Sequence, residues 1–221
     1  FVDLDPLKLE DGVSVEFISP GTPLPGNADL IILPGSKATL SDLAFFRSQG
    51  WDIDLAGHVR RGGHVLGICA GYQMLGKTIS DPAGIESVKG EREGLGYLDV
   101  TTTMSPEKQV AQVEAYSKMF ECDISGYEIH IGETIGPDLS SDICEARSKS
   151  LAARSRSGQI MGVYLHGLFD DDVFRTRFLK RLSTRHKQSL EYDQKIEDTL
   201  DSLADELESR LDIDGLLKLS A

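Results

Sequence analysis

One cysteine of this sequence lies where a catalytic nucleophile is usually held. Cys69 stands in the segment Gly67-Ile68-Cys69-Ala70-Gly71, where an apolar strand-like run gives way to helical spacing. This is the pattern of a nucleophile elbow, with Cys in place of Ser. Glycines two residues before and after the nucleophile prevent collisions between the turn and its neighbours. A helix N-terminus stabilises a thiolate, so Cys69 is predicted to attack an amide rather than to be a small buried cysteine.

A thiolate nucleophile needs a partner that accepts and donates protons, most often a histidine. His166 follows the apolar run "MGVYL" and precedes Gly167, which places it at a strand's end, where catalytic groups gather in open α/β sheets. It is the predicted base and acid. His130 in "GYEIH" has a similar context and is the alternative. The other three histidines are interpreted as structural or surface residues: His58, His64 and His186.

The composition excludes several classes of protein. The net charge of −13 opposes binding to nucleic acid. No run of about eighteen apolar residues is present to cross a membrane. Cys122 and Cys144 stand in segments without any elbow pattern, and the three cysteines form neither a disulfide framework nor a metal-binding CxxC pair. No metal site is therefore predicted, and a reducing cytoplasm is the expected location.

The pattern of apolar runs predicts an α/β fold. Short apolar runs at 30–33 and 64–68 are each followed by a loop and helical spacing, which indicates an open, mostly parallel sheet flanked by helices, with the later strands in its far half. One domain is expected over 1–185. Residues 186–221 are expected to form a C-terminal helical extension, whose apolar stripe packs on the same domain or, alternatively, on a missing partner. The stripe consists of Ile196, Leu200, Leu203, Leu207 and Leu211.

Five segments occur in an order that resembles the cobyric acid synthases, whose C-terminal part is a class I glutamine amidotransferase domain of flavodoxin-like fold. The segments are "LPGSKATLSDL", "GHVLGICAGYQMLG", "GLGYLDV", "GYEIHIG" and "GVYLHGLFD". The resemblance implies hydrolysis of L-glutamine to glutamate and ammonia through a Cys69 thioester, with His166 as base and acid. It also implies an N-terminal synthetase domain, absent here, that uses ATP and Mg²⁺ to amidate a corrinoid acceptor, adenosylcobyrinic acid a,c-diamide, in cobalamin biosynthesis. No phosphate-binding loop occurs in this sequence, so no cofactor is expected in this domain.

The same resemblance assigns further residues to the site. Gly35 and the backbone N–H of Ala70 would form an oxyanion hole. Gln73 would hold the substrate or the shape of the site, although a helical glutamine is often only solvated. Glu128 and His130 alternate onto one side of their strand and are treated as contacts to the charged ends of glutamine or to the partner domain.

The sequence departs from the wider class at one position. Many class I amidotransferases carry a Glu two residues after the catalytic histidine, and here that position is Leu168. The third member of the triad is therefore left open: Cys69 and His166 form a dyad or recruit another carboxylate. Asp170 and Asp171 lie nearby but are better explained as a helix N-cap.

Three other interpretations remain at this point. The first is the glutaminase of a related amidotransferase, acting in cobyrinic acid a,c-diamide formation or in amidation of a peptidoglycan precursor. The second is a non-catalytic regulatory module that keeps the fold, although both Cys69 and His166 are present. The third is a cysteine peptidase or thiol chaperone, which leaves "GYEIH" and "YLHGLF" without an explanation.

Overall fold

Two open sheets form the body of the protein. The computed structural model describes residues 2–86, 89–145, 151–183, 190–213 and 215. The first sheet has the order β1 (Leu30–Leu33), β2 (His64–Ile68), β8 (Ile160–Val163) and β7 (Ala152–Arg154). Its first three strands are parallel and β7 is antiparallel. These strands are short and apolar, and β8 is buried along its whole length, as expected for a sheet covered on both faces.

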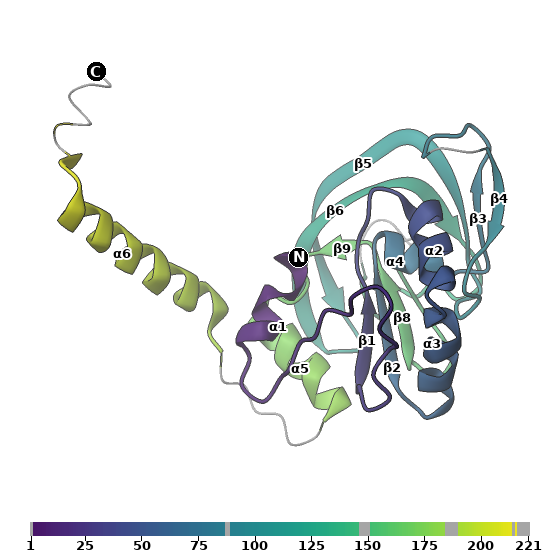
Figure 1. The fold of residues 1–221 in the computed structure, drawn as a ribbon, viewed down its shortest axis with the longest axis horizontal. Helices are drawn as coiled ribbons and strands as arrows, with labels where there is room; N and C mark the ends of the chain where they lie inside the picture. Colours follow the sequence, from purple (N-terminus) through teal and green to yellow (C-terminus); the bar gives the residue numbers. More distant parts are fainter. Residues whose placement is uncertain (1, 87–88, 146–150, 184–189, 214, 216–221) are drawn as a thin grey trace.

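Helices flank this sheet on both sides. In Figure 1, α2 and α3 lie on one side of β1, β2 and β8, and α1 and α5 lie on the other. Gly50 joins α2 to α3 with a φ of +73°, a backbone conformation that favours glycine at the end of a helix. The helices of the body are η1 (Val2–Leu4), α1 (Asp5–Leu9), α2 (Thr39–Ser48), α3 (Trp51–Arg60), α4 (Ala70–Leu75) and α5 (Asp172–Leu182).

The second sheet is largely antiparallel. Its order is β4 (Gly90–Glu93), β3 (Thr78–Asp81), β5 (Thr101–Ser117), β6 (Cys122–Ile135) and β9 (Leu165–His166), and only β3 and β5 run parallel. The predicted open α/β architecture with flanking helices is confirmed. The later strands, however, do not all continue the first sheet. Val163 pairs with Ile68 in the first sheet, whereas His166, three residues later, pairs with Tyr127 in the second.

A buried ion pair fastens the N-terminal segment to the body. Glu10 accepts a hydrogen bond of 2.8 Å from Nε of Arg175 on α5, and both side chains are fully buried. The guanidinium also donates to the carbonyls of Phe169 and Leu190 and to the carboxylate of Asp172. Arg175 therefore joins the N-terminal segment, the loop after His166 and the chain that leads to the last helix.

Removing this arginine should destabilise the fold strongly. Arg175→Ala removes the fully buried cation that pairs with Glu10, so we expect the free energy of unfolding to fall by about 3–5 kcal/mol in urea denaturation. The exposed pair of Lys118 and Glu145, 2.9 Å apart, is the matched control, because Lys118→Ala breaks an ion pair that water already screens and should change stability little. Equal costs for the two substitutions would contradict the anchoring role.

The C-terminal helix projects from the body. None of the residues of α6 (Tyr192–Arg210) is buried, and Figure 1 shows the helix extending away from both sheets. The expected helix is present, but the structure does not show the expected packing on its own domain, because no described element lies against the apolar stripe. The predicted boundary at 185/186 and His186 lie outside the described residues. No helix of the described part is both long enough and apolar enough to span a membrane.

Candidate active site

Cys69 lies at the sharp turn between β2 and α4. Its φ of 52° and ψ of −110° are unusual for a residue with a side chain, and such strain is typical of functional sites. The elbow predicted from the sequence is therefore present. A Cβ on Gly67 would lie 2.6 Å from backbone atoms of Gly71, and a Cβ on Gly71 would lie 1.9 Å from the carbonyl oxygen of Leu33. Both glycines are required by close approach of the backbone, as predicted.

The elbow should not tolerate even a methyl group at Gly71. Gly71→Ala forces α4 away from β1, so we expect a loss of about 3 kcal/mol of stability and displacement of Cys69. Gly26→Ala is the control, since a Cβ there meets its nearest neighbour, the Arg61 side chain, at 4.0 Å. Thermal unfolding of both variants checks this expectation. A Gly71→Ala protein as stable as Gly26→Ala would show that the elbow relaxes freely.

His166 ends β9 and faces the same place as Cys69. Gly35 lies against both side chains. A Cβ added to Gly35 would be 3.5 Å from Cβ of Cys69 and 3.7 Å from Nε2 of His166. Only a glycine leaves this space open between the two side chains. Nε2 is buried, and no described group completes a hydrogen bond to it. The structure thus brings together three of the residues predicted from the sequence.

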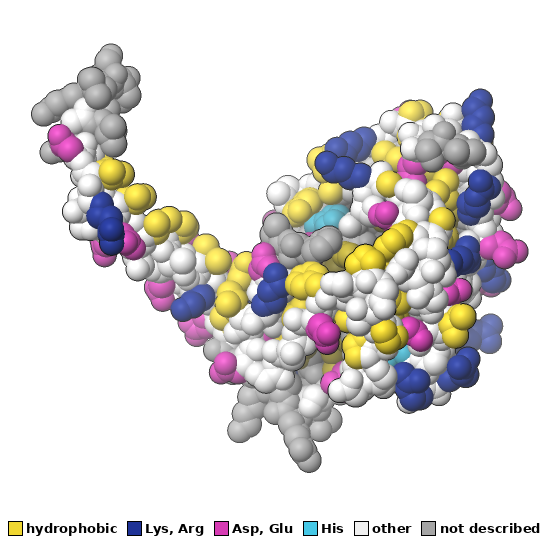
Figure 2. All heavy atoms as spheres, in the orientation of Figure 1, with side chains coloured by type: hydrophobic (Ala, Val, Ile, Leu, Met, Phe, Trp, Pro, Cys, Tyr) yellow, Lys and Arg dark blue, Asp and Glu magenta, His cyan; other side chains and the backbone are white. Residues whose placement is uncertain are grey.

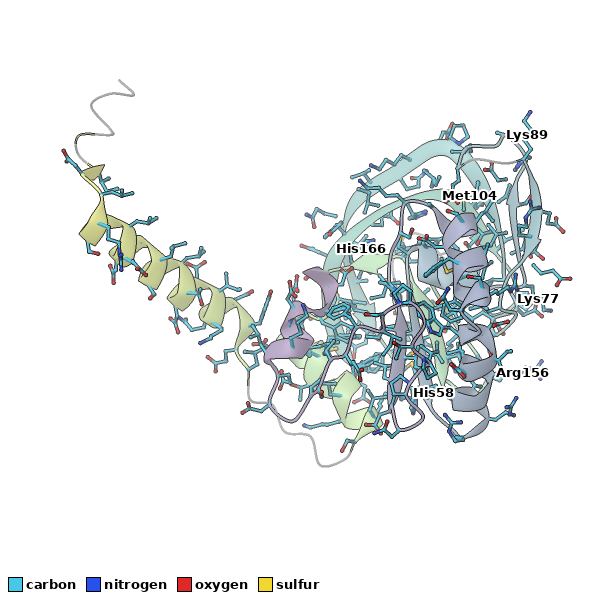
Figure 3. All side chains as sticks on the ribbon, in the orientation of Figure 1. His58, Lys77, Lys89, Met104, Arg156 and His166 are labelled. Carbon is cyan, nitrogen blue, oxygen red and sulfur yellow. The ribbon has the colours of Figure 1, made fainter. Side chains whose placement is uncertain are left out.

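The other edge of the His166 ring is held by an aspartate from the start of the chain. Nδ1 of His166 lies 2.9 Å from Oδ2 of Asp3, and the backbone N–H of Gly167 donates to Oδ1 over 2.9 Å. Figure 3 shows His166 beside η1 and far from His58. The ring of Tyr127 stacks on the imidazole with a centroid distance of 5.2 Å. Asp3 and Tyr127 thereby fix the position and tilt of the ring.

These contacts change the protonation of both partners. The hydrogen bond to Asp3, and then the Cys69 thiol, raise the pKa of His166 to about 9, against the opposing effect of burial. Burial favours a raised pKa for Asp3, but the hydrogen bonds from His166 and Gly167 outweigh it and hold that pKa below its ordinary value. At neutral pH the imidazole is therefore an imidazolium beside a carboxylate.

Asp3 was missed from the sequence, because no local pattern links it to a histidine 163 positions away. The alternatives near His166 have other roles. Leu168 is buried in the core. Asp171 caps α5 by accepting a hydrogen bond from the backbone N–H of Phe174, as predicted. Burial and the neighbouring Asp3 carboxylate raise the pKa of Asp170. A raised pKa disfavours the charged carboxylate, so Asp170 is a poorer partner for a cation than Asp3.

Comparison with known proteins agrees with this geometry. Residues 1–174 match the family described as the CobB/CobQ-like glutamine amidotransferase domain. The chain belongs to this family. It is 53% identical over 220 residues to a cobyric acid synthase of Cereibacter sphaeroides, covering 100% of this chain and 46% of that protein. A cobyric acid synthase of Brucella canis is 51% identical over 100% of this chain and 45% of its own length.

This glutamine amidotransferase domain thus spans about half the length of the curated relatives it matches. Among solved structures, a chain of PurLQS from Thermotoga maritima superposes with a TM-score of 0.57 at 16% identity, covering 81% of this chain and 91% of that one. At this identity the similarity concerns the fold alone.

Gln73 of the amidotransferase domain is part of a buried polar network. Its amide donates to the carbonyl of Ile131 over 3.0 Å and to the hydroxyl of Tyr164 over 3.1 Å, and its oxygen accepts from Thr39 over 3.1 Å. The side chain is therefore not solvated. These contacts favour the prediction that Gln73 holds the shape of the site. They join α4, the helix that begins directly after Cys69, to β6 and to α2.

Glu128 and His130 lie on one side of β6, as predicted, and contact each other. Oε2 of Glu128 is 3.5 Å from Nε2 of His130, and the imidazole stacks on Tyr164 with a centroid distance of 3.7 Å. Burial lowers the pKa of His130, although Glu128 acts against this. Alternation along the strand puts both side chains on the face opposite Tyr127, which stacks on His166. The geometry therefore favours His166 over His130 as the base.

The other two cysteines have no catalytic surroundings. Burial raises the pKa of Cys122 and raises that of Cys144 to about 11. Both thiols are free and buried in the core. Among the described residues, Cys69 is the one cysteine that lies beside a histidine charged at neutral pH.

Proposed function

We propose that this domain is the glutaminase of a cobyric acid synthase and hydrolyses L-glutamine to glutamate and ammonia. The observation that carries the proposal is the meeting of Cys69 and His166 beside Gly35, with Asp3 holding the other edge of the His166 ring. The similarity to curated cobyric acid synthases along the whole chain supports this enzyme over related amidotransferases. Intact Cys and His groups argue against a non-catalytic module.

The first half of the reaction forms a thioester. The pair enters the cycle with the proton of Cys69 already on His166, as a thiolate beside an imidazolium, and the thiolate attacks the side-chain carbonyl carbon of glutamine. The backbone N–H groups of Gly35 and Ala70 stabilise the oxyanion of the tetrahedral intermediate. The His166 imidazolium then donates its proton from Nε2 to the amide nitrogen. The C–N bond breaks, and ammonia leaves.

The second half regenerates the enzyme. Neutral His166 takes a proton from a water molecule, whose oxygen attacks the thioester carbon. The C–S bond breaks, glutamate is released, and the Cys69 thiolate again faces an imidazolium. Throughout the cycle Asp3 holds Nδ1–H, so that Nε2 is the nitrogen that exchanges protons with the substrate.

The ammonia is consumed elsewhere in the full-length protein. An N-terminal synthetase half, outside this chain, activates side-chain carboxylates of adenosylcobyrinic acid a,c-diamide with ATP and Mg²⁺, and ammonia converts them to amides in cobalamin biosynthesis. No cofactor is expected in this domain itself. The full-length enzyme acts in the cytoplasm, without nucleic acid or membrane as a partner.

A diazoketone analogue of glutamine tests the proposal. Such an analogue alkylates the nucleophile of a glutaminase, so peptide mass mapping of the full-length protein should find an adduct on Cys69, and excess glutamine should prevent it. Cys122 and Cys144 serve as internal controls because both are buried and free. An adduct on either of them with Cys69 unmodified would refute the assigned nucleophile.

A further inference from the structure

The projecting helix α6 carries an apolar stripe that nothing in the described structure covers. The stripe consists of Ile196, Leu200, Leu203, Leu207 and, just beyond the helix, Leu211, and these side chains are 38% to 53% exposed. Figure 2 shows hydrophobic side chains in a row along one edge of the helix, with acidic side chains on the other edge. A row of this kind spans about 22 Å along a helix axis.

The two faces of α6 differ too sharply for a helix that functions alone in water. The face opposite the stripe carries polar residues: Asp198, Ser202, Asp205 and Ser209. Helices of this type are stabilised mainly by packing of the apolar face, and five neighbouring exposed aliphatic side chains form a surface that normally marks an interface. The stripe therefore requires an occupant.

We propose that the stripe docks on the part of the full-length polypeptide that lies outside this chain. The family match ends at residue 174, before α6 begins, whereas the match to cobyric acid synthases extends over 100% of this chain. The helix therefore belongs to the full-length relatives beyond the shared amidotransferase domain. This chain covers 46% of the Cereibacter protein, so more than half of that polypeptide is available to cover the stripe.

The size of the stripe favours a tethered occupant over a separate one. A stable complex between separate proteins buries about 800 Å² on each partner, more than one row of five side chains supplies. A segment of the same polypeptide is present at an effective concentration in the millimolar range, so a small interface is sufficient. The covalent connection thus compensates for the limited area.

The charge of α6 argues against a second copy and against a membrane. The helix contains seven acidic residues and two basic ones, Lys195 and Arg210. Two copies packed stripe to stripe would bring like charges together, including Glu197 and Glu206 beside the stripe. Amphipathic helices that lie on membranes carry Lys and Arg on the polar face, the reverse of what is found here. The docking surface is expected to be an apolar groove with a basic rim.

Hydrogen exchange in the full-length protein tests the docking. Leu203→Gln with Leu207→Gln removes apolar surface and keeps the helix propensity, because Leu and Gln are similar in this respect. We expect amide exchange in α6 to accelerate on the order of 100-fold, since two buried leucines lose their contacts. Ser202→Gln with Ser209→Gln, on the opposite face, should leave the exchange unchanged. Trypsin should likewise cleave after Lys195 and Arg210 faster in the leucine variant than in the wild-type protein or the serine variant.

Three results would overturn the proposal. The first is exchange in wild-type α6 as fast as in the leucine variant, because the stripe would then be uncovered. The second is protection that disappears on dilution together with a dimeric mass, which identifies a second copy. The third is protection that appears only with lipid vesicles. The measurement does not use glutamine, so its outcome is independent of the proposed glutaminase activity.

Discussion

Cys69→Ala is expected to lower glutamine hydrolysis by the full-length protein on the order of 10⁴-fold or more, because it removes the sulfur that forms the thioester in the proposed mechanism. Amidation of the proposed corrinoid acceptor with ammonium salts should continue at the wild-type rate, since free ammonia bypasses the proposed glutaminase. Glutamate release and amide formation, each measured with glutamine and with ammonium as the nitrogen source, separate the two activities.

Matched controls exist in the same chain. Cys122→Ala and Cys144→Ala change buried thiols that lie away from His166, so they should cost stability but leave glutamine hydrolysis of the folded protein intact. Glutamine-dependent amidation that persists in Cys69→Ala would remove this residue from its role. Loss of amidation with both nitrogen sources would instead indicate that the substitution damages the fold.

The nucleophile could be predicted from the sequence because its requirements are local. An elbow needs a strand, a helix and two glycines within a few residues, and the close contacts at Gly67 and Gly71 show why no other residue fits. His166 could be predicted for a similar reason, since a histidine at the end of an apolar strand is visible as a pattern. The roles of Gly35 and Gln73 came from family resemblance, and the structure supplies the contacts behind them.

Features that depend on distant contacts could not be predicted in this way. The split into two sheets depends on a change of partner between Val163 and His166, which no periodicity reveals. The stripe of α6 was recognised, but its surroundings depend on contacts that a periodic pattern does not encode. The carboxylate that holds His166 comes from the opposite end of the chain and is held there by the buried pair of Glu10 and Arg175.

Asp3→Asn is expected to lower kcat for glutamine hydrolysis on the order of 100-fold, with a smaller effect on KM. The amide removes the main cause of the raised pKa of His166, so that pKa should fall from about 9 toward the ordinary 6.5. The imidazolium that donates a proton to the departing ammonia is then lost at lower pH. The alkaline limb of kcat/KM should therefore shift from about pH 9 toward neutrality.

The pH dependence separates this positioning role from a purely structural one. Asp5→Asn is the matched control, because Asp5 lies in the same segment and pairs on the surface with Lys8. It should leave the alkaline limb in place.

Because the folded pKa of His166 is raised, its stabilising contribution is complete below about pH 6.5 and is lost as the pH rises through about 9. Wild-type protein should therefore lose thermal stability across this interval more steeply than Asp3→Asn. An unshifted alkaline limb in Asp3→Asn would show that the pair of Cys69 and His166 works without a third member.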